Sequence, residues 1–467
     1  MKVAEKKITT KTFTSSGSWY CPAGITSLNY YLIKNNLNVG PHSFVQIASA
    51  CAGSNAGNGA SFGRKQDGTL WTWGAGSLLG NGTTASVSSP ILVIGNHSFI
   101  DIYSAGYGIT PVSIALARKQ DGSIWSWGAN TAGALGDGTV AGRSSPVLVV
   151  GLHSFIEMTC GTSDFPGGFS AARKETGDVW AWGFNTYGAL GLGTTVSNNS
   201  PALVIGTHSF IQIKATYSGA AARKQDGTVW TWGYSSSGQN GDNSTNYRSS
   251  PVLVVGNHSF VEIVGGYRAV YARNQDGSVW GWGLNSEGEI GDKTTINKSS
   301  PILVVGNHSF IKISSNNAAS CFGIKQDGTI WAWGNNSSSG SSVLGDGTTN
   351  NRSSPILVLI GGRSFTSVFC GHSCSLAQKS NGLIWAWGAN LNGQLGNYTT
   401  TYRSSPVISA CAASTISNTH NFTNALPVSP NTTYNISFYN EDYGMPAVKF
   451  GNTFLGNGDS LVISWVE

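Results

Sequence analysis

The sequence predicts an all-β protein, a seven-bladed β-propeller plus a small β-sandwich-like domain formed by both termini. The pattern Trp-x-Trp-Gly occurs seven times at intervals of 50 to 55 residues, a period typical of repeat architectures such as propellers. A Ser-Pro step and a short apolar run follow each copy, and only 10% of the residues are charged. Abundant Gly, Ser, Thr and Asn favour short strands and turns. We expect blades centred on Trp71, Trp125, Trp180, Trp230, Trp280, Trp331 and Trp385.

The fourth copy shows how one unit divides into four strands. Residues 209–213 form a mostly apolar first strand, and the small side chains of 220–224 suit a second strand in a crowded place. Asp-Gly at 226–227 predicts a tight hairpin turn. Residues 229–232 form the third strand, with both tryptophans on one face because side chains alternate. The fourth strand, 251–255, begins at a proline, and four strands make one blade.

The recurrent aromatic, histidine and cysteine side chains are interpreted as structural. We expect the repeat tryptophans to form the core between blades, and each His of the His-Ser-Phe steps to be a turn residue rather than a metal ligand, because it recurs once in every blade. We interpret the cysteines as buried free thiols. No metal and no cofactor are therefore expected. The tryptophans are Trp71, Trp73, Trp125, Trp127, Trp180, Trp182, Trp230, Trp232, Trp280, Trp282, Trp331, Trp333, Trp385 and Trp387.

The repeat resembles that of the regulator of chromosome condensation family, whose members are seven-bladed propellers. Its seventh unit carries segments similar to the family's Gly-x-x-His-Ser-Leu, Asp-Gly, Trp-Gly and Gly-Gln-Leu-Gly landmarks, at 371–376, 381–382, 387–388 and 393–396. Cys374 and Asn381 depart from the family's usual His and Asp. The resemblance covers about residues 36–410. It implies the fold but no single activity, since the family includes a nucleotide exchange factor, a photoreceptor and β-lactamase inhibitors.

The two chain ends resemble the opening and closing parts of glycine-rich tail-fibre domains of bacteriophages. The similar segments are 8–27 at the start, and 428–437 and 450–465 at the end. We therefore expect residues 1–35 and 412–467 to build one attachment domain, with the propeller, 36–411, inserted into it. Insertion is geometrically easy because ring closure makes the first and last blades neighbours. Two unrelated terminal strands that brace the ring are the alternative, and either 37–42 or 406–408 could supply the strand that closes it.

Loop length indicates where a partner would bind. The segment from the Phe of the first strand to the Lys before the hairpin is longer in units one to three, at 21, 20 and 19 residues, than in units four, six and seven, at 14, 15 and 14 residues. Extra length in one repeated loop is typical of a binding face. These loops and their neighbours carry aromatic and Arg side chains of the kind that dominate interfaces, although the same side chains could simply pack the loops. The predicted partner-binding residues are Tyr103, Tyr107, Ile109, Phe165, Tyr217, Tyr267 and Arg268.

The motifs of common enzyme classes are missing, so we expect no catalytic residues and a protein that is not an enzyme. No basic tract suggests nucleic-acid binding, and no apolar segment suggests a signal peptide or membrane insertion. Our hypothesis is a bacteriophage virion protein, a tail fibre, receptor-binding or surface-decoration protein made in the host cytoplasm. Its terminal domain would bind other virion proteins and its propeller a host-surface glycan or protein. The alternative is a cytoplasmic protein–protein interaction module of the inhibitor or GTPase-regulator type, and the third class is an enzyme acting on cell-wall glycans.

Overall fold

The computed structural model describes the propeller over residues 44–409, apart from 51–59, 75, 107–112, 152, 162–166, 316–318, 337–341, 360–363, 372, 381–382, 392 and 398; of residues 1–43 and 410–467 it describes the strands only. The chain divides into two compact units, one of Met1–Pro41 with Ala413–Glu467 and one of His42–Ala412. The domain boundaries expected from the sequence lie among residues outside this description and stay a prediction.

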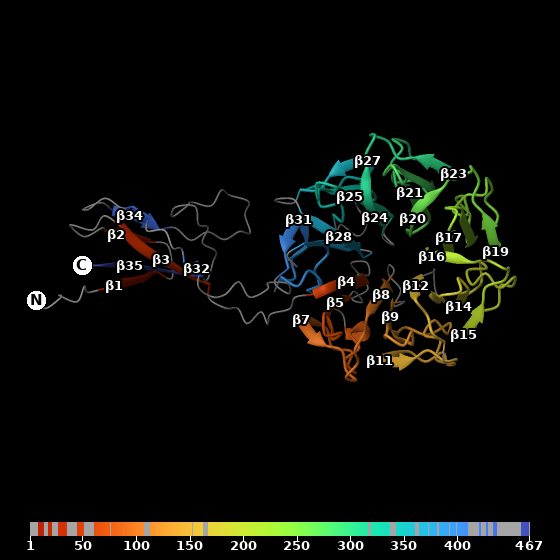
Figure 1. The fold of residues 1–467 in the computed structure, drawn as a ribbon, viewed down its shortest axis with the longest axis horizontal. Coiled ribbons are helices and arrows are strands. Elements are labelled where there is room, and N and C mark those ends of the chain that lie inside the picture. Colours follow the sequence, from red (N-terminus) through yellow and green to blue (C-terminus); the bar gives the residue numbers. More distant parts are fainter. Residues whose placement is uncertain are drawn as a thin grey trace, which may run out of the picture. The chain divides into compact units, whose positions relative to one another are not determined.

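The larger unit is the predicted all-β seven-bladed propeller, and each blade is an antiparallel sheet of four consecutive strands (Figure 1). The first strand of every blade lines the centre of the ring and the fourth is outermost. Blades one to three contain β4 (Phe44–Ala50), β5 (Ala60–Lys65), β6 (Leu70–Gly74), β7 (Val87–Leu92), β8 (Asp101–Gly106), β9 (Ser113–Arg118), β10 (Ile124–Gly128), β11 (Arg143–Leu148), β12 (Glu157–Gly161), β13 (Phe169–Arg173), β14 (Val179–Gly183) and β15 (Asn198–Leu203), with a 3-10 turn, η1 (Gly76–Leu78), after β6.

The remaining four blades repeat this plan with nearly constant strand lengths. Blades four and five contain β16 (Phe210–Ala215), β17 (Gly219–Lys224), β18 (Val229–Gly233), β19 (Arg248–Leu253), β20 (Phe260–Gly265), β21 (Ala269–Asn274), β22 (Val279–Gly283) and β23 (Lys298–Leu303). Blades six and seven contain β24 (Phe310–Ser315), β25 (Ser320–Lys325), β26 (Ile330–Gly334), β27 (Arg352–Leu357), β28 (Phe365–Cys370), β29 (Cys374–Lys379), β30 (Ile384–Gly388) and β31 (Arg403–Ile408).

The hairpin turn between the second and third strands also holds the start of the next blade, as the Asp-Gly turn of blade four shows. Gly227 has φ +84°, which glycine adopts without steric cost. Its carbonyl accepts a hydrogen bond of 3.0 Å from the backbone N–H of Phe260, at the start of β20. A Cβ on Gly227 would lie 2.8 Å from that same nitrogen. The turn therefore requires glycine both for its backbone conformation and for its contact with the following blade.

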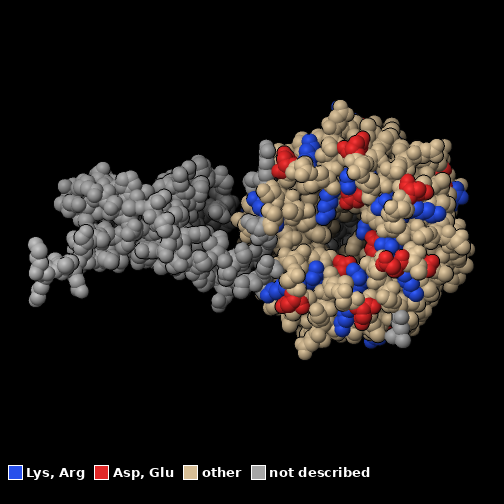
Figure 2. All heavy atoms as spheres, in the orientation of Figure 1, with Lys and Arg blue, Asp and Glu red and all other residues tan. Residues whose placement is uncertain are grey.

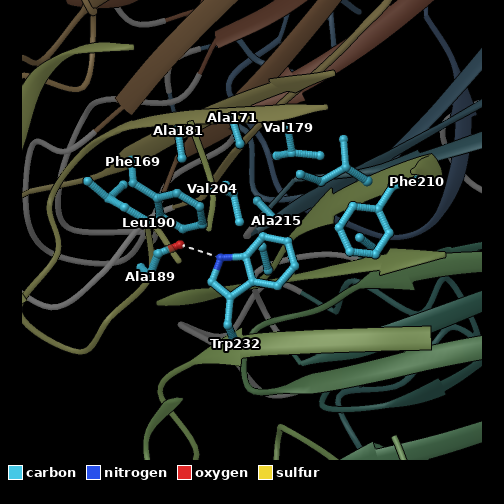
Figure 3. Close-up of a cluster of buried hydrophobic side chains, with 13 residues drawn as sticks. Phe169, Ala171, Val179, Ala181, Ala189, Leu190, Val204, Phe210, Ala215 and Trp232 are labelled. Atoms are coloured by element: carbon cyan, nitrogen blue, oxygen red, sulfur yellow. Dashed lines mark hydrogen bonds between the residues drawn. The ribbon is translucent and has the colours of Figure 1, made fainter. Parts of the chain in front are cut away.

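The second tryptophan of each repeat packs between its own blade and the preceding one. Trp232 of blade four lies among buried side chains of blade three, including Phe169 and Leu190, as Figure 3 shows. Its indole Nε1 donates a 2.9 Å hydrogen bond to the backbone carbonyl of Ala189 in blade three. Burial of a large apolar ring stabilises the interface, and the hydrogen bond leaves its one polar atom satisfied. Each such tryptophan thus joins two neighbouring blades.

The first tryptophan of each repeat occupies a different environment, which differs from the expectation that all fourteen form the core between blades. Trp230 is half-buried at the edge of the core cluster that also contains Trp232. The imidazole of His208 packs 4.5 Å from its ring and the ammonium of Lys224 lies 4.8 Å from its ring centre. The His of the His-Ser-Phe step therefore packs on a tryptophan. Among the described residues, no group of three or more His, Cys, Asp or Glu side chains could hold a metal ion.

The ring closes through side chains and not through an exchanged strand. The outermost strand of blade seven is β31, which follows β30 in the chain, and β4 begins blade one. Residues 406–408 therefore belong to the last blade, and 37–42 lie outside the described residues. The indole of Trp73 donates to the carbonyl of Gln394, and the amide of Gln378 donates to the carbonyl of Phe44 over 2.6 Å. These contacts join blades one and seven.

The terminal unit contains strands from both ends of the chain. β35 (Asp459–Val466) lies between β1 (Ile8–Phe13) and β3 (Ser27–Lys34), antiparallel to both. β2 (Gly17–Tyr20) pairs with β34 (Thr433–Ile436), while β32 (His420–Asn421) and β33 (Leu426–Pro427) pair with β3. The sandwich-like arrangement and the attachment role expected for this unit stay predictions.

The expectation of free thiols is wrong for one cysteine. Cys374, at the start of β29, is disulfide-bonded, with its partner outside the described residues. Cys160, Cys321 and Cys370 are free. Within the described part of the chain, no helix is long and apolar enough to cross a membrane.

Candidate functional site

Six aromatic side chains from blades three to five meet on the propeller face opposite the Asp-Gly turns. This face carries the loops from the first to the second strand and from the third to the fourth strand of each blade. We call this group the aromatic cluster: Phe184, Tyr187, Tyr217, Tyr234, Tyr247 and Tyr267.

The rings of the aromatic cluster form a continuous set of contacts. The Tyr234 and Tyr247 rings are stacked, with centres 4.9 Å apart and planes 28° apart. Tyr187 meets both of them edge to face, at 5.0 Å and 5.4 Å. Tyr217 and Tyr267, from neighbouring blades, make an edge contact at 4.8 Å. Offset and edge contacts of this kind stabilise aromatic pairs beyond their buried area, so the rings support one another's positions.

Arg268 lies at the centre of the cluster. Its guanidinium carbon is 4.9 Å, 5.0 Å and 5.1 Å from the ring centres of Tyr217, Tyr234 and Tyr267. The negative faces of aromatic rings attract a cation at such distances. Burial by itself would lower the pKa of Arg268, but Tyr267, Tyr234 and Tyr217 together raise it. The site therefore holds a permanent positive charge among tyrosine rings.

Short, well-connected loops position these side chains. The turn that carries Tyr217 is closed by a 2.8 Å hydrogen bond from the Thr216 N–H to the Gly219 carbonyl, and an equivalent 2.8 Å bond joins Gly266 to Ala269 below Tyr267. The Tyr234 N–H donates to the Ser218 carbonyl over 2.9 Å. Because backbone bonds fix both turns, the rings are placed before any partner arrives.

The loop that carries Tyr247 is held by a charged pair. The Nε of Arg248, the next residue, donates to a carboxylate oxygen of Asp242 over 2.8 Å. This carboxylate also accepts from the Ser244 hydroxyl over 2.8 Å. Burial opposes ionisation, but these hydrogen bonds lower the pKa of Asp242 below its usual value, so the pair is charged at neutral pH.

The cluster has a buried floor and an accessible rim. Tyr217 is only 1% exposed and Phe184 is buried, whereas Tyr247 is 49% exposed. Tyr187, Tyr234 and Tyr267 are half-buried. A partner would therefore contact the rim side chains, and the floor would hold them in place.

The structure brings together three of the seven predicted partner-binding residues, Tyr217, Tyr267 and Arg268, although Tyr217 supports the site from below. Tyr103 is elsewhere: it lies on β8 and lines the central channel, where burial raises the pKa of its hydroxyl. Tyr107, Ile109 and Phe165 lie outside the described residues. Whether any of the seven binds a partner stays a prediction.

Sequence reasoning missed Phe184, Tyr187, Tyr234 and Tyr247. A signal was present, because Phe184 and Tyr234 each follow a Trp-x-Trp-Gly copy directly. The predicted binding residues were chosen from the length of the loop between the first and second strands, and these four residues lie outside that loop. All four of these rings come from loops between the third and fourth strands, on the same face of the propeller.

The half-buried tryptophans are poor platforms for sugars. Stacking on a sugar needs an open ring face, and Lys and His side chains pack against these rings. The contacts recur in blades two, three, four and six, where each tryptophan has a His ring at 4.3 to 4.5 Å and a Lys ammonium at 4.5 to 4.9 Å. The aromatic cluster is therefore the better candidate for a recognition site.

Comparison with known protein families assigns the propeller. The model of the RCC1-like domain matches residues 112–424. The chain belongs to the RCC1-like domain family. This agrees with the resemblance seen in the repeat and with the seven-bladed ring. The match does not extend to the first terminal segment, and the likeness of the chain ends to bacteriophage tail-fibre domains is not shown.

Several relatives of this RCC1-like propeller are known. Human E3 ubiquitin-protein ligase HERC2 is 32% identical over 143 residues, 30% of this chain but 3% of that protein. The ultraviolet-B receptor UVR8 of Arabidopsis thaliana is 30% identical over 138 residues, 29% of this chain and 30% of that protein. The matches therefore span less than a third of either relative's length.

Among solved structures, Prp20p of Saccharomyces cerevisiae shares the fold. It aligns with a TM-score of 0.59 and 19% identity, covering 84% of this chain and 87% of that chain. At this identity the likeness concerns the fold alone.

Proposed function

We propose that this protein is a non-enzymatic protein-interaction module that binds its partner through the aromatic cluster. The observation that carries this proposal is the convergence of six aromatic rings on one propeller face, three of them around Arg268. Tyr and Arg are enriched among the residues that dominate protein interfaces. Tyrosine also supplies a large contact area at a low cost in side-chain entropy.

The family supports a binding role over catalysis. RCC1-like propellers are mainly non-enzymatic, and HERC2 is named a ligase although the match spans only 3% of it. The Prp20p structure was described with that protein's binding properties to Gsp1p and histones. The partner of the present chain is proposed to be a protein, in the manner of an inhibitor or a GTPase regulator.

The test compares partner capture by matched variants. Wild-type protein, a Tyr187→Ser/Tyr247→Ser variant and a Val140→Ser/Leu359→Ser control would be used to purify partners from the cells that produce the protein. The control removes two exposed apolar side chains, 60% and 58% exposed, outside the aromatic cluster. We expect one protein to be retained by wild type and control and reduced at least about tenfold by the tyrosine variant. That protein, purified, should then bind wild type directly. Equal retention by all three would refute the proposal, provided that their melting temperatures agree.

Attachment to a virus particle is a second proposal. It is supported by the resemblance of the chain ends to bacteriophage tail-fibre domains and by the pairing of β35 with both β1 and β3, which unites the two ends in one sheet. In this case the protein would be present in purified particles, and the propeller would bind the surface of host cells. Mass spectrometry of purified particles tests attachment. Absence from particles, together with a stable intracellular complex, would exclude it.

A further inference from the structure

The centre of the propeller contains a channel that the proposed partner site does not use. Its cavity of about 430 Å³ is lined by the first strands of all seven blades. Figure 2 shows one face of the ring hollowed at its centre, with charged side chains gathered around the hollow. The volume lies within the range of small-molecule sites.

A carboxylate–arginine pair is repeated around this channel. In blades two, three and five, the first strand carries an acidic residue. The second strand carries an arginine directly opposite it. Arg118 lies 3.7 Å from Asp101, Arg173 3.0 Å from Glu157, and Arg273 2.8 Å from Glu262. In these blades each arginine lies on the second strand, behind the channel lining, and has a carboxylate partner on the first strand.

Two blades keep the arginine but lack the carboxylate. In blade one Arg64 donates to the side-chain carbonyl of Gln46 over 3.1 Å, and in blade four Arg223 donates to that of Gln212 over 3.2 Å. A neutral amide satisfies the hydrogen bond but not the charge. Burial lowers the pKa of both arginines, and nearby carboxylates only partly oppose this. Blades one and four therefore hold half-buried cations whose direct partners are neutral.

Blade six reverses the pattern. Lys312 occupies the position of the acid, and Ile324 faces it across the strand pair where other blades have arginine. Lys312 is exposed to the channel, and no ion pair to it is found among the described residues. Blade four adds Lys214, whose ammonium shares the Glu157 carboxylate, at 3.1 Å, with Arg173. One carboxylate thus balances two cations.

Among the described residues, the charged side chains that line the channel itself are two lysines and three carboxylates. When the second-strand arginines that contact these first-strand side chains are included, seven cations accompany the three carboxylates, an excess of four positive charges. A narrow cavity with low-dielectric walls focuses such a field. The cations are Arg64, Arg118, Arg173, Arg223, Arg273, Lys214 and Lys312.

We propose that the central channel binds one small multivalent oxyanion, held mainly by Lys312 and Lys214. The Ser104 hydroxyl lines the same cavity and is buried without a hydrogen-bond partner among the described residues, so it is available to donate to the ligand. Lysine binds phosphate and carboxylate groups as a point charge. An oxyanion would supply the negative charge that blades one, four and six lack.

Calorimetric titration of the full chain at low salt tests the site, with tripolyphosphate and citrate as probes. These distinguish a phosphate preference from a carboxylate preference within the same chemistry. We expect saturable binding of one anion per chain and a higher melting temperature. Lys312→Gln should weaken binding about tenfold, because one charge-assisted contact is lost, and Ser104→Ala should weaken it less.

The matched control is Lys293→Asn, which removes one exposed charge from the loop between β22 and β23. Lys293 has φ +65°, and Asn243 has φ +62° at the equivalent place in blade four, so the backbone accepts asparagine. The control should bind as wild type does. The proposal is overturned if neither probe binds saturably, or if Lys312→Gln and Lys293→Asn lower the affinity equally, which would indicate attraction to the net charge alone. Partner capture by the tyrosine variants is a separate measurement, so the two proposals fail independently.

Discussion

The indole Nε1 of Trp73 donates a 3.1 Å hydrogen bond to the backbone carbonyl of Gln394, 321 positions away in the sequence. The equivalent bond is present at five of the six other junctions, for example from Trp127 to Leu78 over 2.8 Å. Blade seven therefore meets blade one by the contact that most other pairs of neighbouring blades use. A ring closed in this way needs no additional strand.

One junction lacks this hydrogen bond and therefore provides an internal control. At the junction of blades five and six, the carbonyl of Glu289 accepts a 2.8 Å hydrogen bond from the Tyr271 hydroxyl. The Nε1 of Trp333 is then buried without a hydrogen-bond partner among the described residues. The two kinds of junction differ by one hydrogen bond.

We expect Trp73→Phe to lower the free energy of unfolding by about 2–3 kcal/mol, through lost packing and a lost hydrogen bond. Trp333→Phe should cost about 1 kcal/mol less, because its indole N–H makes no such bond. Urea unfolding followed by circular dichroism measures both values. Equal costs would show that the Trp73 hydrogen bond adds nothing to ring closure.

Glu289 makes the stability of the protein depend on pH. Burial raises the pKa of its carboxyl to about 7, although backbone hydrogen bonds oppose the shift. Because the folded state holds its proton more tightly than the unfolded state, the stabilisation is complete below the ordinary pKa and is lost as pH rises through about 7. The loss amounts to at most about 3 kcal/mol.

The variant Glu289→Gln should remove this dependence and raise the melting temperature at pH 8 relative to wild type. Glutamine already occupies the equivalent positions of blades four and seven, as Gln239 and Gln394, so the replacement fits the repeat. Scanning calorimetry from pH 5 to pH 8 compares the two proteins. Parallel curves would mean that Glu289 is ionised in the fold.

The histidines that pack on tryptophan rings make the stability of the protein depend on pH in the direction opposite to Glu289. Burial, reinforced in most blades by a nearby lysine, lowers the pKa of His97, His153, His208, His258 and His308 below 6.5. The folded state then binds fewer protons than the unfolded state, so their contribution to stability is present above the unfolded pKa and is lost as pH falls. Titration of the ring protons by NMR should give five midpoints below 6.5. Midpoints at or above 6.5 would contradict the packing of these rings on tryptophan.

The three free cysteines in the described part of the chain should react slowly with alkylating reagents. Burial raises the pKa of the Cys160, Cys321 and Cys370 thiols above their ordinary value, and the thiolate is the reactive form. We expect iodoacetamide at pH 7.5 to leave the buried Cys160 and Cys321 unmodified in the native protein and to modify them after unfolding. Mass spectrometry of peptides measures how much of each cysteine is alkylated. Rapid labelling of Cys160 or Cys321 in the native protein would show that the blades open.

The sequence by itself determined the ring of blades. Trp-x-Trp-Gly, Asp-Gly and Ser-Pro recur at fixed places because each blade makes the same local contacts, namely a hairpin turn that needs glycine at Gly227 and an indole that reaches the preceding blade. Such contacts repeat with the chain, so a single sequence reveals them. It also indicated Tyr217, Tyr267 and Arg268 as candidates for binding.

Only the tertiary structure determined which side chains of different blades become neighbours. The cluster joins Tyr187 of blade three to Tyr247 of blade four and Tyr267 of blade five, and it excludes Tyr103, which lines the channel. The uneven charge around Lys312 also arises between distant positions. No local pattern encodes them, because the closing of the ring sets which loops become neighbours and which side chains share one channel.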